Sequence, residues 1–367
     1  MQLSSHKKYS GAIVLGDSFN NTLGLIRSIG EAHVPVCLIL EGNDRLFISH
    51  SRYVTECYHI NTLDDAPGLL ADLYNTHQNY ALICSNDKAA LLIDSNEATL
   101  SALYHTPMRG KALDHLFDKD AQCALAEKCG FTVPQSAIYT RGNSFPTEIQ
   151  YPLLIKPANS NCGEKSDIHI CRDTTDLNKA LSANSICETF IVQEFIEKDY
   201  EINMIGISTD REVIVPGGIK KLRHYPNING PCSFGRFMPA ESLGVDIEPI
   251  RRFITESEYR GPFSVELLRK GNNDYFMEFN FRHDGLAYSA TASGANLMKR
   301  FFGTAPIGKV RPTYMMDLSV DFMHVKHKHI SFVRWIGDFI RTGCQLNFNI
   351  KDPRPTLNYY KAKLLRN

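Results

Sequence analysis

Residues 261–282 read GPFSVELLRKGNNDYFMEFNFR and decide the fold. Two runs of alternating residues flank Gly271-Asn272-Asn273, a turn-forming sequence, and predict an antiparallel hairpin. Glu266 and Glu278 lie six residues either side of Asn272, so a hairpin centred there places them opposite each other on one face. Like charges in that arrangement repel each other, and we therefore expect a positive group between them.

The second strand of this hairpin carries a row of polar residues. Glu278, Asn280 and Arg282 share one face by alternation, whereas the residues between them are apolar and predict the core face. The two glutamates and the amide oxygen of Asn280 form a hard oxygen set that suits Mg²⁺, with Mn²⁺ as an alternative. Arg282 is placed to stabilise a phosphoryl group during transfer. A solvated face with an Arg–Glu pair is the competing interpretation.

The first 110 residues predict a separate α/β domain with a parallel sheet, because strand-length apolar runs alternate there with helical patterns. The glycines between Gly16 and Gly24 lack the G-x-G-x-x-G spacing, which disfavours dinucleotide binding. The expected strands are residues 12–15, 34–40 and 80–84, and the expected helices are residues 23–29 and 88–93.

Two separated lysines precede the hairpin. Lys119 begins a predicted helix, and Lys156 closes an apolar strand in YPLLIKPANS, so each is placed to reach a phosphate. The small polar loop over residues 158–167 offers backbone N–H groups to the same kind of anion.

Residues 191–204, IVQEFIEKDYEINM, predict two strands joined by a short connection. Gln193, Glu194 and Glu201 interrupt these otherwise apolar strands. A polar edge followed by an apolar lining suits a purine, and a further carboxylate suits ribose hydroxyls. Polar residues of an edge strand that face water are the competing interpretation.

Taken in order, these features resemble the ATP-grasp superfamily of carboxylate–amine ligases, over residues 1 to about 305. The matching pieces are Lys119, Lys156-Pro157, Gln193-Glu194-Phe195-Ile196, Glu201, Glu266 and the run from Glu278 to Arg282. The loop after Lys156 has one glycine, Gly163, and departs from the family's Gly/Ser-rich form. The resemblance implies an α/β and α+β protein: an ATP-grasp fold with an N-terminal Rossmann-like pre-ATP-grasp domain. The implied segments are residues 1–110 (pre-ATP-grasp domain), 111–190 and 191–310 (the two ATP-grasp subdomains, the second with the metal site), and 311–367 (a basic C-terminal segment).

The resemblance also implies roles for individual residues. Lys119 and Lys156 would contact the phosphates of ATP, and Lys156 would also act in catalysis with Arg282. The adenine edge would lie at Gln193, Glu194 and Ile196, the ribose near Glu201, and Mg²⁺ at Glu266, Glu278 and Asn280. The implied reaction joins a small carboxylate to an amine through an acyl phosphate, with ADP released.

A cationic stretch supplies the candidate residues for the carboxylate substrate. Lys220, Lys221, Arg223 and Arg236 flank a loop over residues 225–235. His283 follows the metal strand closely enough to line the acceptor pocket. An ordinary surface loop is the competing interpretation. Within the superfamily, the sequence looks most like the D-aspartate ligase and carbamoyl-phosphate-synthase-like branch, and no motif for biotin or purine substrates is recognised.

Composition limits the classes of partner. The chain has 40 basic and 40 acidic residues, which disfavours nonspecific nucleic-acid binding. It has no apolar run of the roughly 18 residues that a membrane span needs, and its ten cysteines form no C-x-x-C pair. We therefore expect a cytoplasmic protein without integral membrane contact that acts on small molecules, a homo-oligomer being compatible with this. Residues 311–367 carry ten Lys or Arg against four Asp, so this segment is basic. The alternative function is a non-catalytic ATP-binding regulatory protein.

Overall fold

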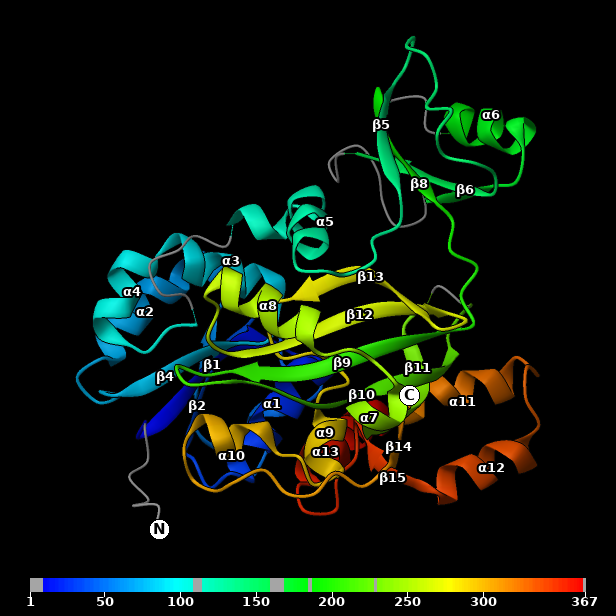
Figure 1. Ribbon diagram of the computed structural model, residues 1–367. Coiled ribbons are helices and arrows are strands. Elements are labelled where there is room, and N and C mark those ends of the chain that lie inside the picture. Colours follow the sequence, from blue (N-terminus) through cyan, green and yellow to red (C-terminus); the bar gives the residue numbers. More distant parts are fainter. Residues whose placement is uncertain (1–8, 108–113, 159–167, 184–186, 228–229, 366–367) are drawn as a thin grey trace. The chain divides into compact units, whose positions relative to one another are not determined.

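The computed structural model describes residues 9–107, 114–158, 168–183, 187–227 and 230–365 (Figure 1). The chain forms two compact units. The first unit comprises residues 1–130, 200–267 and 277–367, and the second comprises residues 131–199 and 268–276.

The N-terminal part of the first unit contains a four-stranded parallel sheet of order β3-β2-β1-β4. Its strands are β1 (Gly11–Asp17), β2 (Val36–Glu41), β3 (Val54–Ile60) and β4 (Tyr80–Cys84). Helices α1 (Asn20–Gly30), α2 (Ala66–Leu73), α3 (Asp87–Ser95) and α4 (Glu97–Leu103) lie between and after these strands. The predicted α/β architecture with a parallel sheet is confirmed. The hydrophobic pattern did not predict strand β3, since its residues are largely half-buried or exposed.

A seven-stranded sheet of order β13-β12-β9-β10-β11-β14-β15 carries the predicted hairpin at one edge. Its strands are β9 (Tyr200–Ser208), β10 (Val213–His224), β11 (Cys232–Pro239), β12 (Pro262–Lys270), β13 (Asn273–Asn280), β14 (Thr313–Met316) and β15 (Thr342–Gln345). The turn of the hairpin uses Gly271, whose φ of 56° suits glycine because it has no Cβ. Phe263, Phe279 and Phe281 pack against Phe253 or one another on the core side, as the alternation predicts.

The second unit contains a four-stranded sheet of order β5-β8-β6-β7. Its strands are β5 (Ser136–Thr140), β6 (Leu153–Pro157), β7 (His169–Cys171) and β8 (Thr189–Glu194), and helix α6 (Thr174–Ala183) accompanies them. Leu153, Ile155, Phe190 and Val192 form the centre of its apolar core.

The remaining helices belong to the first unit. They are α5 (Lys119–Lys128), α7 (Ala240–Leu243), α8 (Glu248–Ser257), α9 (Tyr288–Ala292), α10 (Leu297–Phe301), α11 (Leu318–Lys326), α12 (Phe332–Ile340) and α13 (Arg354–Leu365). Over the residues that the structure describes, no helix combines the length and the apolar character needed to cross a membrane.

A fully buried ion pair ties the C-terminal segment to the N-terminal domain. Arg27 Nε of α1 donates to Asp352 Oδ2 at 3.1 Å, and both side chains have no exposed surface. The Arg27 guanidinium also donates to the carbonyls of Leu346, Asn347 and Asp352. Asp352 in turn accepts from Ser51 Oγ. Both members of the pair thus have further hydrogen-bond partners, which a buried charge requires.

We predict that Arg27→Met lowers the free energy of unfolding by about 3 to 5 kcal/mol, because the Asp352 carboxylate stays buried without its counter-charge. Urea titration followed by circular dichroism measures this. Lys128→Met is the control, since it breaks the exposed pair between Lys128 and Glu256 and should change the stability little. Equal effects of the two substitutions would contradict the assignment.

Candidate active site

A row of charged side chains crosses three neighbouring strands of the seven-stranded sheet. Lys221 Nζ of β10 lies 2.8 Å from Glu201 Oε2 of β9 and 2.9 Å from Glu266 Oε2 of β12. Lys220 pairs with Ile202, which places Lys221 and Glu201 side by side on the other face of the sheet. The positive group expected beside Glu266 is therefore Lys221, and Glu201 shares it.

Burial and charge act in opposite directions on Lys221. Burial of the ammonium alone would lower its pKa, but attraction by Glu266 and Glu201 and their hydrogen bonds outweigh this and raise the pKa above its usual value of 10.5. The ammonium therefore stays charged at neutral pH. His224 Nε2 approaches the same Glu201 oxygen at 3.5 Å, so two nitrogen groups face this carboxylate.

The predicted metal ligands follow along the same sheet. Asn280 Nδ2 donates to Ser264 Oγ at 3.3 Å, which brings the ends of β12 and β13 together. Residues two apart on a strand lie on the same face, so Glu266 lies on the face of Ser264 and Glu278 lies on the face of Asn280. Among the described residues, no three His, Cys, Asp or Glu side chains converge as a metal cluster. The set that remains is two carboxylates and one amide oxygen, whose chemistry fits Mg²⁺.

One further group on this face is not satisfied. Asn203 is 1% exposed, and its Oδ1 has no hydrogen-bond partner among the described residues. Asn203 lies two residues after Glu201 on β9 and so has the same face. A buried acceptor without a donor is costly, and a bound ligand or water would satisfy it.

Arg282 is held by the N-terminal domain. Its guanidinium donates to both carboxylate oxygens of Asp87, at 2.7 and 3.1 Å, and to Asn280 Oδ1 at 2.9 Å. Asp284 Oδ2 lies 3.8 Å away. Asp17 lies nearby, at the end of β1. Burial raises the pKa of its carboxyl group, although a hydrogen bond with Asn86 acts to lower that pKa. The end of the hairpin and the carboxyl ends of β1 and β4 thus meet at Arg282.

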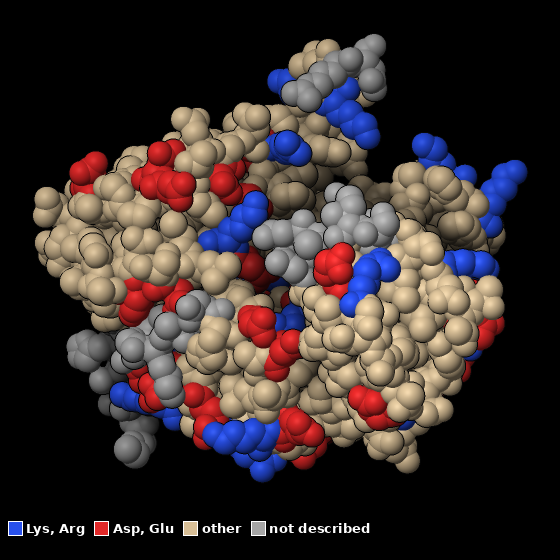
Figure 2. All heavy atoms as spheres, turned by 90° about the horizontal axis from the view of Figure 1, so that it is seen from above, with Lys and Arg blue, Asp and Glu red and all other residues tan. Residues whose placement is uncertain are grey.

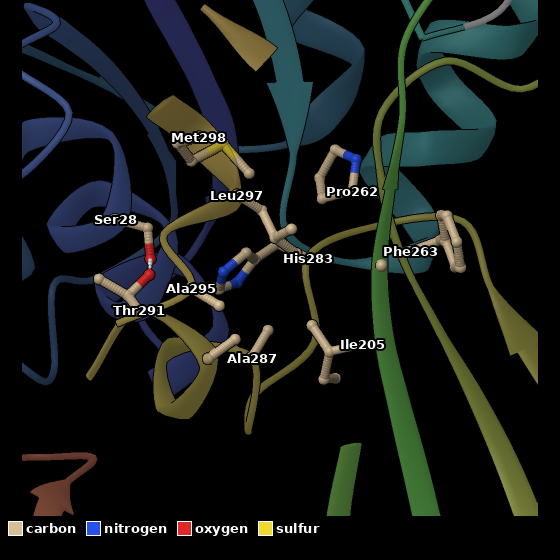
Figure 3. Close-up of a pocket in the computed structure, with 12 residues that line it drawn as sticks. Ser28, Ile205, Pro262, Phe263, His283, Ala287, Thr291, Ala295, Leu297 and Met298 are labelled. Carbon is tan, nitrogen blue, oxygen red and sulfur yellow. Dashed lines mark hydrogen bonds between the residues drawn. The ribbon is translucent and has the colours of Figure 1, made fainter. Parts of the chain in front are cut away.

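His283 is buried beside a small cavity (Figure 3). The side chain is 3% exposed, and the cavity lined by Ile205, Phe263, Leu297 and other apolar residues holds about 10 Å³. Burial lowers the pKa of His283 to about 4, so the imidazole is neutral at pH 7. His283 therefore does not present a charge to a substrate, and its Nδ1 is without a hydrogen-bond partner among the described residues.

Of the four cationic residues expected at the substrate, Lys221 instead binds Glu201 and Glu266, and the other three have different surroundings. Lys220 Nζ lies 3.6 Å from the centre of the Tyr200 ring, and Arg236 lies over the ring of Tyr314. Lys220 and Arg236 are paired directly across β10 and β11. Arg223, in contrast, is bound by two carboxylates, as described below. The structure therefore brings Lys220 and Arg236 together and leaves Arg223 in an internal ion-pair network.

The residues expected at the nucleotide occur in both units. Lys119 is the first residue of α5, whose N-cap Asp118 accepts from the backbone N–H groups of Asp120 and Ala121. In the second unit, Lys156 lies near the end of β6, and Gln193 and Glu194 end β8.

Glu194 Oε2 accepts from the backbone N–H of Gln135 at 3.4 Å, and Ile196 is buried. The phosphate loop expected after Lys156 lies mostly outside the described residues, which resume at Ile168.

Thiol chemistry finds no support at this site. Most of the nine cysteines among the described residues are buried. Burial raises the pKa of Cys84 and of Cys232 to about 12, so both thiols are protonated at neutral pH.

Sequence reasoning gave one residue of this site another role and missed a second. Lys221 was expected at the substrate with Lys220, because alternation alone does not say which of the two lysines faces the glutamates. Asp87 follows the turn-like Ser85-Asn86 after β4, and its partner Arg282 is 195 residues away. The sequence did place Asp87 just after a predicted parallel strand, a position at which α/β proteins often carry functional residues.

Comparison with known proteins gives a distant sequence match. No family model matches the chain. The formate-dependent phosphoribosylglycinamide formyltransferase of a Nitratiruptor species is 28% identical over 262 residues, which are 69% of this chain and 62% of that protein. The chain thus spans less than two thirds of the length of this relative.

Solved structures show the fold. The ADP complex of N5-carboxyaminoimidazole ribonucleotide synthetase matches with a TM-score of 0.66 at 14% identity, over 89% of this chain and 87% of that one. The L-amino acid ligase from Bacillus licheniformis matches with a TM-score of 0.61 at 13% identity, over 83% and 80%. These matches show that the chain has the fold of these structures, the ATP-grasp fold expected from the sequence. Its N-terminal parallel sheet corresponds to the expected Rossmann-like domain.

We predict that Lys221→Met lowers the free energy of unfolding at pH 7 by about 3 kcal/mol, because Glu201 and Glu266 then face each other without a shared cation. The folded-state pKa of Lys221 is raised, so its contribution is fully present below pH 10.5 and is lost as the pH rises through the folded value. The difference between wild type and variant should therefore be constant from pH 7 to about pH 9. Guanidinium titrations at several pH values measure it.

Lys220→Met is the matched control for this experiment. It removes the adjacent lysine and its contact with the Tyr200 ring, which is worth about 1 kcal/mol or less. A Lys220→Met variant that loses more stability than Lys221→Met would show that the buried ion cluster is not the stabilising feature.

Proposed function

We propose that this protein is an ATP-dependent ligase that joins a small carboxylate, such as an amino acid, to an amine, with an acyl phosphate as intermediate and ADP as product. The observation that carries the proposal is the Glu201–Lys221–Glu266 row beside the Asn280–Arg282 pair on the sheet of an ATP-grasp fold. Nothing in the comparisons supports a non-catalytic ATP-binding regulator. We place the reaction in the cytoplasm, and a homo-oligomer stays a prediction.

The residues expected at the nucleotide keep, in this proposal, the roles that the resemblance implies. Lys119 and Lys156 would neutralise phosphate charge, and Gln193, Glu194 and Ile196 would form the adenine edge. Glu201 would lie near the ribose, while its hydrogen bond to Lys221 fixes its position. Glu266, Glu278 and Asn280 would hold Mg²⁺, which in such sites neutralises phosphate charge. Their hard oxygen donors fit that ion.

The reaction would proceed in two displacements. A carboxylate oxygen of the first substrate attacks the γ-phosphorus of ATP, the bond to the β–γ bridging oxygen breaks, and ADP leaves. The amine nitrogen then attacks the acyl carbon, phosphate leaves, and the amine loses a proton. Lys156 and Arg282 would stabilise the charge of the transferred group, Arg282 being oriented by Asp87 and Asn280. Lys220 and Arg236 stay the candidates for the substrate carboxylate, but they pair across β10 and β11 on the face of the sheet opposite Lys221.

A phosphoribosylglycinamide-type acceptor is the second candidate, because the curated relative is a formate-dependent phosphoribosylglycinamide formyltransferase. The small carboxylate would then be formate, and the amine would belong to a ribonucleotide. The two candidates share the acyl phosphate step and differ in the amine. Assays with amino acids and with phosphoribosylglycinamide therefore distinguish them.

We expect phosphate release from Mg²⁺-ATP to require one carboxylate–amine pair in a panel of amino acids, formate and amines. Glu278→Ala should fold normally and lose this turnover by a factor of about a hundred or more, as for loss of a group that stabilises transferring charge. Glu241→Ala, an exposed glutamate of α7, is the control. Wild-type turnover in Glu278→Ala would refute the metal assignment.

We also expect Asp87→Asn to lower kcat by about tenfold to a hundredfold with little change in the KM for ATP, because the Arg282 guanidinium loses its charged anchor. Asp87→Glu should restore part of the rate. Asp72→Asn, an exposed residue of α2, should behave as wild type. A change confined to the KM for ATP would show that Asp87 does not position Arg282 for the chemical step.

A further inference from the structure

The acidic side chains of α11 and α12 point toward the interior of the protein. Asp321 and Asp338 both bind Arg223 of β10, with Arg223 Nη2 2.7 Å from Asp321 Oδ2. The side chain of Asp321 has no exposed surface, and that of Asp338 is 4% exposed. Ser233 Oγ also donates to Asp321. These two carboxylates are therefore used internally and contribute little negative charge to the surface.

The exposed charges of the same segment are all basic. Residues 318–341 contain no other acidic residue, and Lys326, Lys328, Arg334 and Arg341 are exposed. Arg341 also contacts Asp338, which leaves its guanidinium about half exposed. On the face drawn in Figure 2, Lys and Arg side chains lie in several separate places, among them the upper right. The surface of these helices is thus locally cationic although the whole chain is neutral.

Helix α12 adds an exposed apolar face. Phe332 is 55%, Val333 82% and Ile340 76% exposed. At about 100° per residue these positions, with Ile336, fall within about 100° of the helix circumference. Trp335 of the same helix is instead buried against Phe234 and Met316. The apolar surface of α12 is therefore wider than the strip of it that packs against the sheet, and part of it is exposed to solvent.

We propose that α11 and α12 form a peripheral binding surface for an anionic lipid bilayer. We define the basic–apolar patch as Phe332, Val333, Ile340, Lys326, Lys328 and Arg334. Apolar side chains that enter the headgroup region, with cations around them, are the features by which a helix binds in the plane of an anionic membrane. A second copy of the chain docked patch to patch would bring the like charges together, which disfavours self-association through this surface. The inference does not depend on the proposed reaction.

Sedimentation with vesicles tests the proposal on the full chain. We expect the protein to bind vesicles of equal parts phosphatidylcholine and phosphatidylglycerol and not vesicles of phosphatidylcholine alone. Binding should weaken as salt is added, because the cations of the patch are exposed. Lys326→Glu with Lys328→Glu should lower the partition coefficient at least about tenfold.

A second variant tests the apolar part of the same patch. Val333→Glu with Ile340→Glu should lower the partition coefficient by a similar factor, since two exposed side chains can no longer enter the bilayer. Ile350→Glu is the matched control, because Ile350 is 84% exposed but lies outside the patch. The circular dichroism of all variants should equal that of wild type, as the replaced side chains are exposed.

Three outcomes would overturn the proposal. The first is no binding to anionic vesicles, or equal binding to neutral ones. The second is that Ile350→Glu weakens binding as much as the patch variants do. The third is a dimer, seen by sedimentation velocity without vesicles, that the Val333→Glu and Ile340→Glu substitutions dissociate, which would make the patch a contact between copies.

Discussion

The contact of Lys221 with Glu201 and Glu266 is the constraint on which the rest of the site depends. Three strands bring two carboxylates and one ammonium together with little exposure to water, and such charges are stable there only when each is paired. The lysine fixes both glutamates on one face of the sheet and stays protonated at neutral pH. The face on which we propose the metal ligands therefore already contains a cation that limits its negative charge.

Two further ion pairs hold the N-terminal domain. Arg282, at the end of the hairpin, binds Asp87 after β4, and Arg27 of α1 binds Asp352 of the C-terminal segment. Parts of the chain that are distant in sequence are thus held by buried or half-buried guanidinium groups. This arrangement gives the N-terminal domain a direct effect on the orientation of Arg282, the residue placed nearest to the phosphoryl chemistry in our proposal.

The sequence predicted most of the fold, but not the internal contacts of the candidate site. Alternation in residues 261–282 was enough for the hairpin, and the alternating strands and helices before residue 110 were enough for the parallel sheet. Lys221 could not be chosen over Lys220 because their faces depend on the strand register. The ion pairs of Arg223 with Asp321 and Asp338 could not be predicted, because the partners lie about a hundred residues away in the sequence. Arg223 was therefore expected at the substrate. His283 was placed beside the acceptor, whereas packing buries it in an apolar cavity.

The most direct test of the central claim is anomalous diffraction from crystals grown with Mn²⁺ and a non-hydrolysable ATP analogue. We predict an anomalous peak in coordination contact with the side-chain oxygens of Glu266, Glu278 and Asn280, with Lys221 still bound to Glu201. A nucleotide bound without any Mn²⁺ at these three residues, or Mn²⁺ bound by other side chains, would contradict the account.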